Sequence, residues 1–394
     1  MRKKLKDVCM FYSGTGFPIQ YQGQTKGEYP FYKVGDIANN AIAGKIYLEL
    51  CNNYISSDVA KMIKGCILPK DTVVFAKIGE ALKLNRRAIT SCDCLIDNNA
   101  MGIAPKLDSL RIQYFYFCMK NLKMQTLAES TTVPSVRKTV LEKYEIEVPS
   151  LVEQEEIEKK LTLTQKIIEK RRQELSYLDE IIKARFVEMF GDITTGNYKY
   201  DTRKLGDVAN VGSSHRVFTT EFVKKGIPFY RGTEIGELAN GNKPTEPFYI
   251  SEEHYNRLVY NDTKPQVGDL LLPSICNKGQ VWMVDTDEPF YYKDGRVLCI
   301  SPDREIFDTK YLEYFMKAKT LVEYPKLGSG STFAEFKIFL LKDIDVLIPP
   351  RELQEQFSIF VNQVDKSKFD TMTFAPIYDI INLYLHTHFY QGRR

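Results

Sequence analysis

The chain has 394 residues, of which 43% are hydrophobic and 27% are charged. This composition excludes a disordered or low-complexity chain, and the length suffices for two or three hydrophobic cores. With 54 basic and 51 acidic residues the formal net charge is +3, which excludes a uniformly basic coat but leaves room for a local basic patch.

The chain shows no targeting or membrane signal. Its first residues are basic, but Asp7 interrupts them before an apolar segment forms, and the apolar run 114–119 is far shorter than the roughly 20 residues that span a bilayer. We therefore expect a cytoplasmic protein with reduced cysteines. Cys92 and Cys94 lack the second ligand pair of a zinc site, so we expect no metal.

Residues 1–149 contain short runs of β-branched and aromatic residues between turn residues, which are typical of strands. One such run is Thr72 to Ala76. Residues 108–123 have the length and the apolar spacing of a helix. The sequence therefore predicts a mixed, mostly β globular domain with one helix.

Residues 150–190 are predicted to form a single long helix, because no glycine or proline occurs between Pro149 and Gly191. At 1.5 Å per residue it would be about 60 Å long. Its apolar residues follow alternating steps of four and three, as in a coiled coil, with polar interruptions at Thr164, Arg171 and Arg185. An ordinary amphipathic helix on a domain surface is the alternative interpretation.

The second half of the chain repeats the first at an offset of about 200 residues. Four short matches keep their order: 5–8 with 205–208, 30–33 with 228–231, Tyr114, Met119 and Lys120 with Tyr311, Met316 and Lys317, and 148–155 with 348–355. Four collinear matches indicate a duplication of a whole domain with its connecting helix.

The second connecting helix begins after Pro349-Pro350 and is interrupted at 371–376, and the tail 377–390 is helical in pattern but unlike the first copy. We expect the two helices to pair through their apolar positions. These positions are Ile157, Leu161, Ile168, Leu175, Leu178, Ile182, Leu353, Phe357, Phe360 and Val364.

Four catalytic patterns fail on inspection. The Tyr12-Ser13-Gly14-Thr15-Gly16 turn lacks the strand and the acidic partner of an S-adenosylmethionine site, and Asp303 lies far from Glu335-Phe336-Lys337 for a nuclease set. No phosphate-binding loop of the ATPase type occurs, and the four histidines form no triad. We therefore expect no catalytic residue and no cofactor bound by this chain.

Basic and small polar residues in loop positions of both copies favour DNA binding, since such side chains contact phosphates and base edges. The candidates are Lys33, Lys77, Lys83, Arg86, Arg87, Arg137, Lys138, Ser213, Ser214, His215, Arg216, Arg231, Asn277, Lys278, Lys326, Ser329, Ser331 and Thr332. We expect phosphate contacts from Lys83 and Lys326 and a base-edge contact from Arg216. Taken singly, each of these residues is more often a solvated surface group.

In the order of its sequence motifs, the chain resembles the specificity subunit of Type I restriction-modification systems along almost its whole length. Each half starts with Leu-x-Asp-Val, continues with Pro-Phe-Tyr leading to 35–37 or 233–235, and closes with a proline followed by Gln-Glu. The strand start Gly268-Asp269-Leu270-Leu271 fits the pattern well, whereas the first copy has only Lys70-Asp71-Thr72-Val73.

The resemblance implies a non-catalytic subunit with two target recognition domains, each reading one half of a split, asymmetric sequence in double-stranded DNA. It also implies antiparallel helices that bind two methyltransferase subunits, which use S-adenosylmethionine, and endonuclease subunits that use ATP and Mg. A two-domain adaptor that binds proteins and oligomerises through its helices is the alternative, and a self-sufficient enzyme is a third possibility.

The expected fold is thus α+β. Two similar, mostly β domains at 1–149 and 195–348 are joined and braced by long antiparallel coiled-coil helices at 150–190 and 349–394, the latter shortened or divergent. The sequence does not name the bases that are read.

Overall fold

The computed structural model describes residues 1–49, 51–128, 133–260, 264–327 and 334–372. Contacts divide these into two compact units, Met1–Glu174 and Leu175–Thr371. The boundary falls inside a continuous helix, α7 (Leu151–Phe190), so that each unit contains one part of it. No helix among the described residues is long and apolar enough to cross a membrane.

The first unit is built on a four-stranded antiparallel sheet, a three-stranded sheet and a strand pair. Their orders are β2 (Cys9–Ser13), β8 (Ala100–Pro105), β5 (Val73–Ala76) and β6 (Arg87–Ile89); β4 (Tyr54–Ile55), β3 (Tyr29–Tyr32) and β7 (Leu95–Ile96); and β1 (Arg2–Lys4) with β9 (Glu145–Glu147). Its shorter helices are α1 (Leu5–Val8), η1 (Ile19–Tyr21), α2 (Val34–Ile42), α3 (Ser57–Met62), α4 (Glu80–Lys83), α5 (Ile112–Asn121), η2 (Met124–Leu127) and α6 (Lys138–Glu142).

The second unit repeats this topology with two additions among the described residues, a fourth strand, β14 (Phe222–Val223), in the smaller sheet and the strand pair β10 (Gly191–Asp192) with β11 (Asn197–Tyr198). Its other sheets have the orders β13 (Ala209–Ser213), β20 (Val297–Pro302), β17 (Leu270–Pro273) and β18 (Trp282–Met283); β14, β16 (Phe248–Ile250), β15 (Ile227–Tyr230) and β19 (Tyr291–Tyr292); and β12 (Thr202–Lys204) with β21 (Asp345–Leu347). Its helices are α8 (Leu205–Val208), η3 (Thr219–Glu221), α9 (Gly232–Ala239), α10 (Glu252–Val259), α11 (Thr309–Glu323), η4 (Tyr324–Leu327), α12 (Ile338–Lys342) and α13 (Arg351–Met372).

Strand pairing confirms the duplication at the level of register. Arg2 pairs with Glu147 in the first unit, and Thr202 pairs with Leu347 in the second. The middle strands β3 and β15 each pair in parallel with one neighbour, β7 and β19. The two copies in the sequence are therefore two copies of one α+β fold, as predicted.

The Leu-x-Asp-Val motif forms a single helical turn that closes each core. Leu5 and Leu205 are fully buried, and each donates its backbone N–H to a carbonyl near the end of its domain, Tyr144 at 2.9 Å and Ile344 at 2.8 Å. The motif thus ties the start of each copy to its end, because burial of the leucine fixes the turn beside the last strand.

The Gln-Glu motif anchors each long helix to its domain through a buried glutamine. Gln154 Nε2 donates to the carbonyls of Ser109 and Pro149, both at 2.9 Å, and its Oε1 accepts from the Arg111 N–H at 2.8 Å. Gln354 makes the same set with Ile306 and Pro349. All polar atoms of the buried side-chain amide are hydrogen-bonded in this way, so its burial leaves no polar group unpaired. We call the contacts of Gln154, and the equivalent contacts of Gln354, the glutamine clamp.

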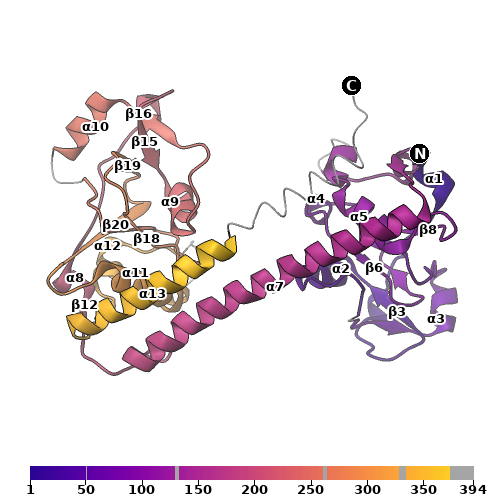
Figure 1. Cartoon of the computed structure of the whole chain (residues 1–394), viewed down its shortest axis with the longest axis horizontal. Coiled ribbons are helices and arrows are strands. Elements are labelled where there is room, and N and C mark those ends of the chain that lie inside the picture. The colour runs from indigo at the N-terminus through magenta and orange to yellow at the C-terminus, as the bar shows by residue number, and fades with distance from the viewer. Residues whose placement is uncertain (50, 129–132, 261–263, 328–333, 373–394) are drawn as a thin grey trace. The chain divides into compact units, whose positions relative to one another are not determined.

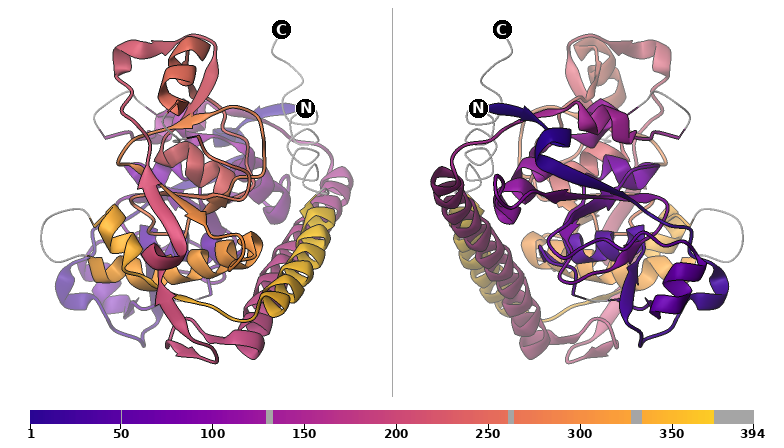
Figure 2. Two further views of the ribbon diagram at one scale, coloured as in Figure 1. Left: turned by 90° about the vertical axis from the view of Figure 1, so that its left-hand side faces the viewer. Right: turned by 90° about the vertical axis from the view of Figure 1, so that its right-hand side faces the viewer.

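In the second unit α13 lies beside the last turns of α7 and runs antiparallel to them (Figures 1 and 2). The direction follows from the contacts: the ring of Phe357 lies 5.4 Å from that of Phe186, and Lys368 near the other end binds Asp179 at 2.6 Å. Aromatic rings dominate this seam, which makes it a large apolar interface rather than a polar one.

The helix-pairing predictions divide between the two units. Ile182, Phe357 and Val364 share one buried core, with Leu178, Leu353 and Phe360 packed against it. Ile157 and Leu161 instead pack into the core of the first domain, so their expected role in helix pairing is wrong for the described residues. Ile168 lines a pocket in the first unit, and its role in helix pairing stays a prediction. Leu175 is half-buried, and the predicted tail 377–390 lies outside the described residues.

Candidate nucleic-acid interface

Two of the loops that we expected to bind DNA lie together in the first unit. The Val136 N–H donates to the Lys77 carbonyl at 2.9 Å, and the Gly79 N–H donates to the Pro134 carbonyl at 2.8 Å. The backbone thus holds the turn after β5 against the segment that leads to Arg137 and Lys138. Lys138 is exposed and lies above the ring of Phe11.

The second unit contains the equivalent pair of loops, with cations that sequence reasoning missed. The Phe336 N–H donates to the Ser274 carbonyl at 2.7 Å. Beside it, Glu335 binds both Lys337 and Arg296, the latter at 2.8 Å. The hydrogen bond from Lys337 lowers the pKa of the Glu335 carboxyl. Lys337 could have been found, since it lies 200 residues after Arg137.

The segment Ser213–Arg216 is fixed by hydrogen bonds and presents its last two residues outward. Ser213 Oγ donates to the Val297 carbonyl at 2.8 Å and Ser214 Oγ to the Tyr292 carbonyl at 2.6 Å. These serines therefore position the loop, whereas His215 and Arg216 are exposed. The Arg216 guanidinium lies 5.5 Å from the centre of the Phe218 ring, which supports it without blocking its donors.

Lys33 and Arg231 occupy equivalent positions but have inward-facing partners. Lys33 Nζ binds Gln22, and Arg231 Nε donates to Glu234 at 3.0 Å. Burial raises the pKa of the Glu234 carboxyl, but hydrogen bonds from Arg231 outweigh it and the net pKa is lowered. Arg231 therefore braces the turn after the Pro-Phe-Tyr strand, whereas Lys33 ties the end of β3 to the segment after η1.

Arg87 departs most from the expected exposed position. It is only 2% exposed, and its Nη2 donates to the carbonyl of Leu122 at 2.6 Å and to Asn85 Oδ1 at 2.9 Å. Arg87 thus joins β6 to the end of α5 inside the fold. Its neighbour Arg86 is half-exposed.

The remaining candidates lie on the surface. Lys83 and Lys326 are exposed and form local ion pairs with Glu80 at 2.7 Å and Glu323 at 3.0 Å. Such exposed pairs contribute little, so these lysines can change partners at small cost. Asn277 and Lys278 are exposed, while Ser329, Ser331 and Thr332 lie outside the described residues.

The glycine turn at Tyr12–Gly16 has a steric explanation. A Cβ on Gly14 would lie 1.7 Å from the carbonyl oxygen of Asp97, so the close approach of two backbones requires glycine there. Among the described residues, no group of three or more His, Cys, Asp and Glu side chains could hold a metal ion.

Comparison with known proteins decides the family. The family model described as the Type I restriction modification DNA specificity domain matches residues 1–177 and again 197–376. The chain belongs to this family. Members confer DNA specificity within a Type I restriction-modification system, so the chain is a specificity component and not the catalytic subunit.

Relatives of the specificity family share the length and the fold of the chain. The chain is 22% identical to the Type I restriction enzyme MjaIX specificity subunit of Methanocaldococcus jannaschii, over 91% of the chain and 85% of that protein. The crystal structure of a Type I restriction-modification S subunit from M. genitalium aligns with a TM-score of 0.53 at 14% identity, covering 100% of this chain and 96% of that one. A structure from a study of complex assembly in the type I R-M system aligns at 0.54 and 16%, covering 98% and 97%.

Proposed function

We propose that each unit reads one half of a bipartite, asymmetric sequence in double-stranded DNA. The duplicated framework carries this proposal. Equivalent strands and turns would place both domains on a duplex in the same way, and the unshared loops would supply different base contacts. The first unit has Gly14-Thr15-Gly16 where the second has Ser214-His215-Arg216, so only the second offers a long cationic side chain there.

The chemistry of the system would then belong to partner subunits. We propose that the helices dock two methyltransferase subunits, which use S-adenosylmethionine, and that endonuclease subunits with ATP and Mg join them in the cytoplasm. In the first unit, Leu163 and Ile167 on α7 are exposed apolar residues four positions apart, as are Tyr177 and Ile181 in the second. Such pairs lie on one helix face and suit a protein partner.

Selection from a random duplex library tests this function. The chain is incubated with the library, with and without its methyltransferase subunits, and bound DNA is sequenced. Enrichment of a motif in two parts separated by a non-specific spacer supports the proposal. No enrichment under either condition would favour the two-domain adaptor instead, since an adaptor needs no DNA.

Two substitutions distinguish base contacts from phosphate contacts. Arg216→Ala is expected to relax selection at one base position, at a cost of roughly 1–3 kcal/mol in discrimination. Lys326→Ala should weaken binding to all sequences alike. The slope of the logarithm of the binding constant against the logarithm of salt concentration should become shallower by about one, as expected for the loss of one phosphate contact. An unchanged motif and unchanged affinity in Arg216→Ala would remove this residue from the interface.

A further inference from the structure

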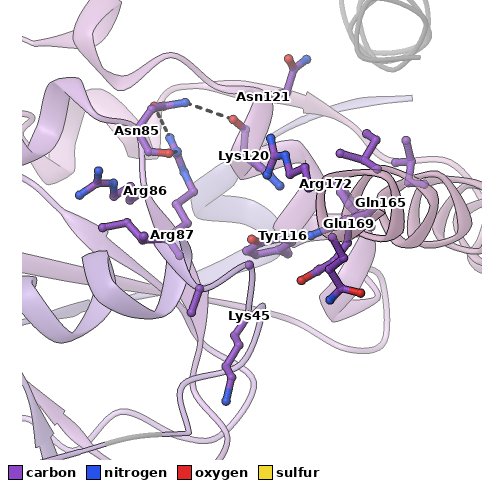
Figure 3. A pocket seen from close by; sticks show the side chains of 18 residues that line it. Lys45, Asn85, Arg86, Arg87, Tyr116, Lys120, Asn121, Gln165, Glu169 and Arg172 are labelled. Atoms are coloured by element: carbon purple, nitrogen blue, oxygen red, sulfur yellow. Dashed lines mark hydrogen bonds between the residues drawn. The ribbon is translucent and has the colours of Figure 1, made fainter. Parts of the chain in front are cut away.

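A pocket of about 500 Å³ opens in the first unit between α7 and three segments of the globular domain, at 41–45, 85–87 and 116–121 (Figure 3). Its walls include the buried side chains of Tyr116, Phe117 and Leu161, so part of the recess is lined by apolar and aromatic surface. A volume of this size suits a small organic ligand. Nothing in the proposed reading of DNA requires such a recess.

Positive charge gathers in this pocket without matching negative charge. Lys120 at the end of α5 and Arg172 on α7 both line it, and among the described residues neither forms an ion pair with a carboxylate. Desolvation, followed by the positive charges of Arg172 and Arg87, lowers the pKa of the Lys120 ammonium group. Glu169 is the one acidic residue in the described lining, and its carboxylate packs beside Gly44.

A polar atom in the wall also lacks a partner. Gln165 on α7 lines the pocket, and its side-chain oxygen is buried without a hydrogen bond to any described residue. A buried acceptor of this kind calls for a donor. A ligand that carries an N–H or O–H group beside an anionic group would satisfy both features.

The second unit shows that the shared fold does not need these unpaired cations. Lys317 is the counterpart of Lys120, and there the residue one turn earlier is Glu313, whose carboxylate binds Lys317 at 2.8 Å and Lys310 at 3.1 Å. In the first unit that position is Tyr116, and Lys120 lies 5.9 Å from the centre of its ring. The duplication has therefore kept the lysine in both copies and neutralised it in one.

We propose that this pocket binds a small phosphorylated molecule of the size of a nucleoside monophosphate. The phosphate would lie between Lys120 and Arg172, the planar or apolar part would rest on Tyr116, and a donor would reach Gln165. Lys120 and Arg172 are exposed at the mouth of the pocket, where a phosphate of either a small molecule or a duplex can reach them. A small molecule is favoured because only it could also enter the recess and contact the buried wall at Tyr116 and the Gln165 oxygen. The sequence predicted no bound cofactor, and this site goes beyond that expectation.

Calorimetric titration of the full-length chain with AMP, and separately with inorganic phosphate, tests the proposal. We expect saturable binding of AMP that weakens roughly tenfold or more in Lys120→Gln and in Arg172→Gln, since each removes a charged hydrogen bond. Lys317→Gln is the matched control and should bind AMP as the unaltered chain does. Arg172 is exposed on α7, so its replacement should leave thermal unfolding unchanged.

Three results would overturn the proposal. The first is no saturable binding of AMP or phosphate at millimolar concentration. The second is equal loss of binding in Lys317→Gln, which would place the ligand elsewhere. In the third, the chain binds a short duplex but not AMP, and both pocket substitutions weaken the duplex, so the cations would hold backbone phosphate instead. Loss of AMP binding in Lys120→Gln but full retention in Lys120→Arg would support a charge contact.

Discussion

The two units fold in the same way but surround the long helix differently. In the second unit α13 covers the end of α7 with Phe357, whose ring packs against Phe186 and Phe190. The equivalent residue in the first unit is Ile157, which packs into the globular domain, and the next turns of α7 border a charged pocket. The comparison teaches that duplication preserved the contacts made by the Leu-x-Asp-Val turn and the buried glutamine in each domain. The residues that surround the long helix, by contrast, diverged.

The largest expected effect comes from exchanging a whole recognition domain. Replacing residues 1–149 with the corresponding domain of a relative should change one half of the methylated motif completely and leave the other half intact, because each unit has its own core. Methylation profiling of genomic DNA from cells that carry the chimera and the methyltransferase measures both halves. A change in both halves, or in neither, would contradict independent reading.

Removing the aromatic seam should strongly destabilise the second unit. Phe357→Ala is expected to lower its free energy of unfolding by about 3–5 kcal/mol, because the ring is fully buried between helices and would leave a cavity. The single tryptophan, Trp282, lies in this unit and reports its unfolding in urea by fluorescence. Ile359→Ala, at an exposed position of the same helix, is the control and should change stability by less than about 0.5 kcal/mol.

The two glutamine clamps should be equivalent in energy although their surroundings differ. Gln154→Leu and Gln354→Leu each leave two carbonyls and one N–H without their partner, which should cost about 1–3 kcal/mol in the affected unit. Exchange of backbone amide hydrogens should accelerate at the start of α7 in the first variant and at the start of α13 in the second. Acceleration in both helices from either substitution would show that the two units do not unfold independently.

The smallest expected effect concerns acid stability. Because the net pKa of Glu234 is lowered from its ordinary value of 4.5, its ion pair with Arg231 stabilises the fold above pH 4.5, and this contribution is lost as the pH falls through the lowered pKa. Glu234→Gln should therefore remove about 1 kcal/mol at neutral pH and flatten the fall in stability below pH 4.5. Glu246→Gln, an exposed residue before β16, should leave the curve unchanged.

Local pattern was sufficient to predict the repeat, the helix from 150 to 190 and the α+β class, because each depends on neighbouring residues or on a fixed offset. The partners of individual side chains could not be predicted in this way. Arg87 looked like a loop cation and is a buried brace, since only the folded chain brings the end of α5 to it. The heptad pattern likewise ran through Ile157 and Leu161 without showing that their face meets the domain and not a second helix. The pocket joins four segments whose lining residues are as many as 132 positions apart, so no local signal could reveal it.

The glutamine clamp bears on how such chains can evolve. Its acceptors are main-chain carbonyls, and the receiving residues are Ser109 in one copy and Ile306 in the other, which share no side-chain chemistry. A contact to main-chain atoms does not depend on the side chain of the residue that receives it. Domains with unrelated surfaces can then be attached to the same helix without a new set of contacts, and the chain still aligns over 91% of its length with a relative at 22% identity.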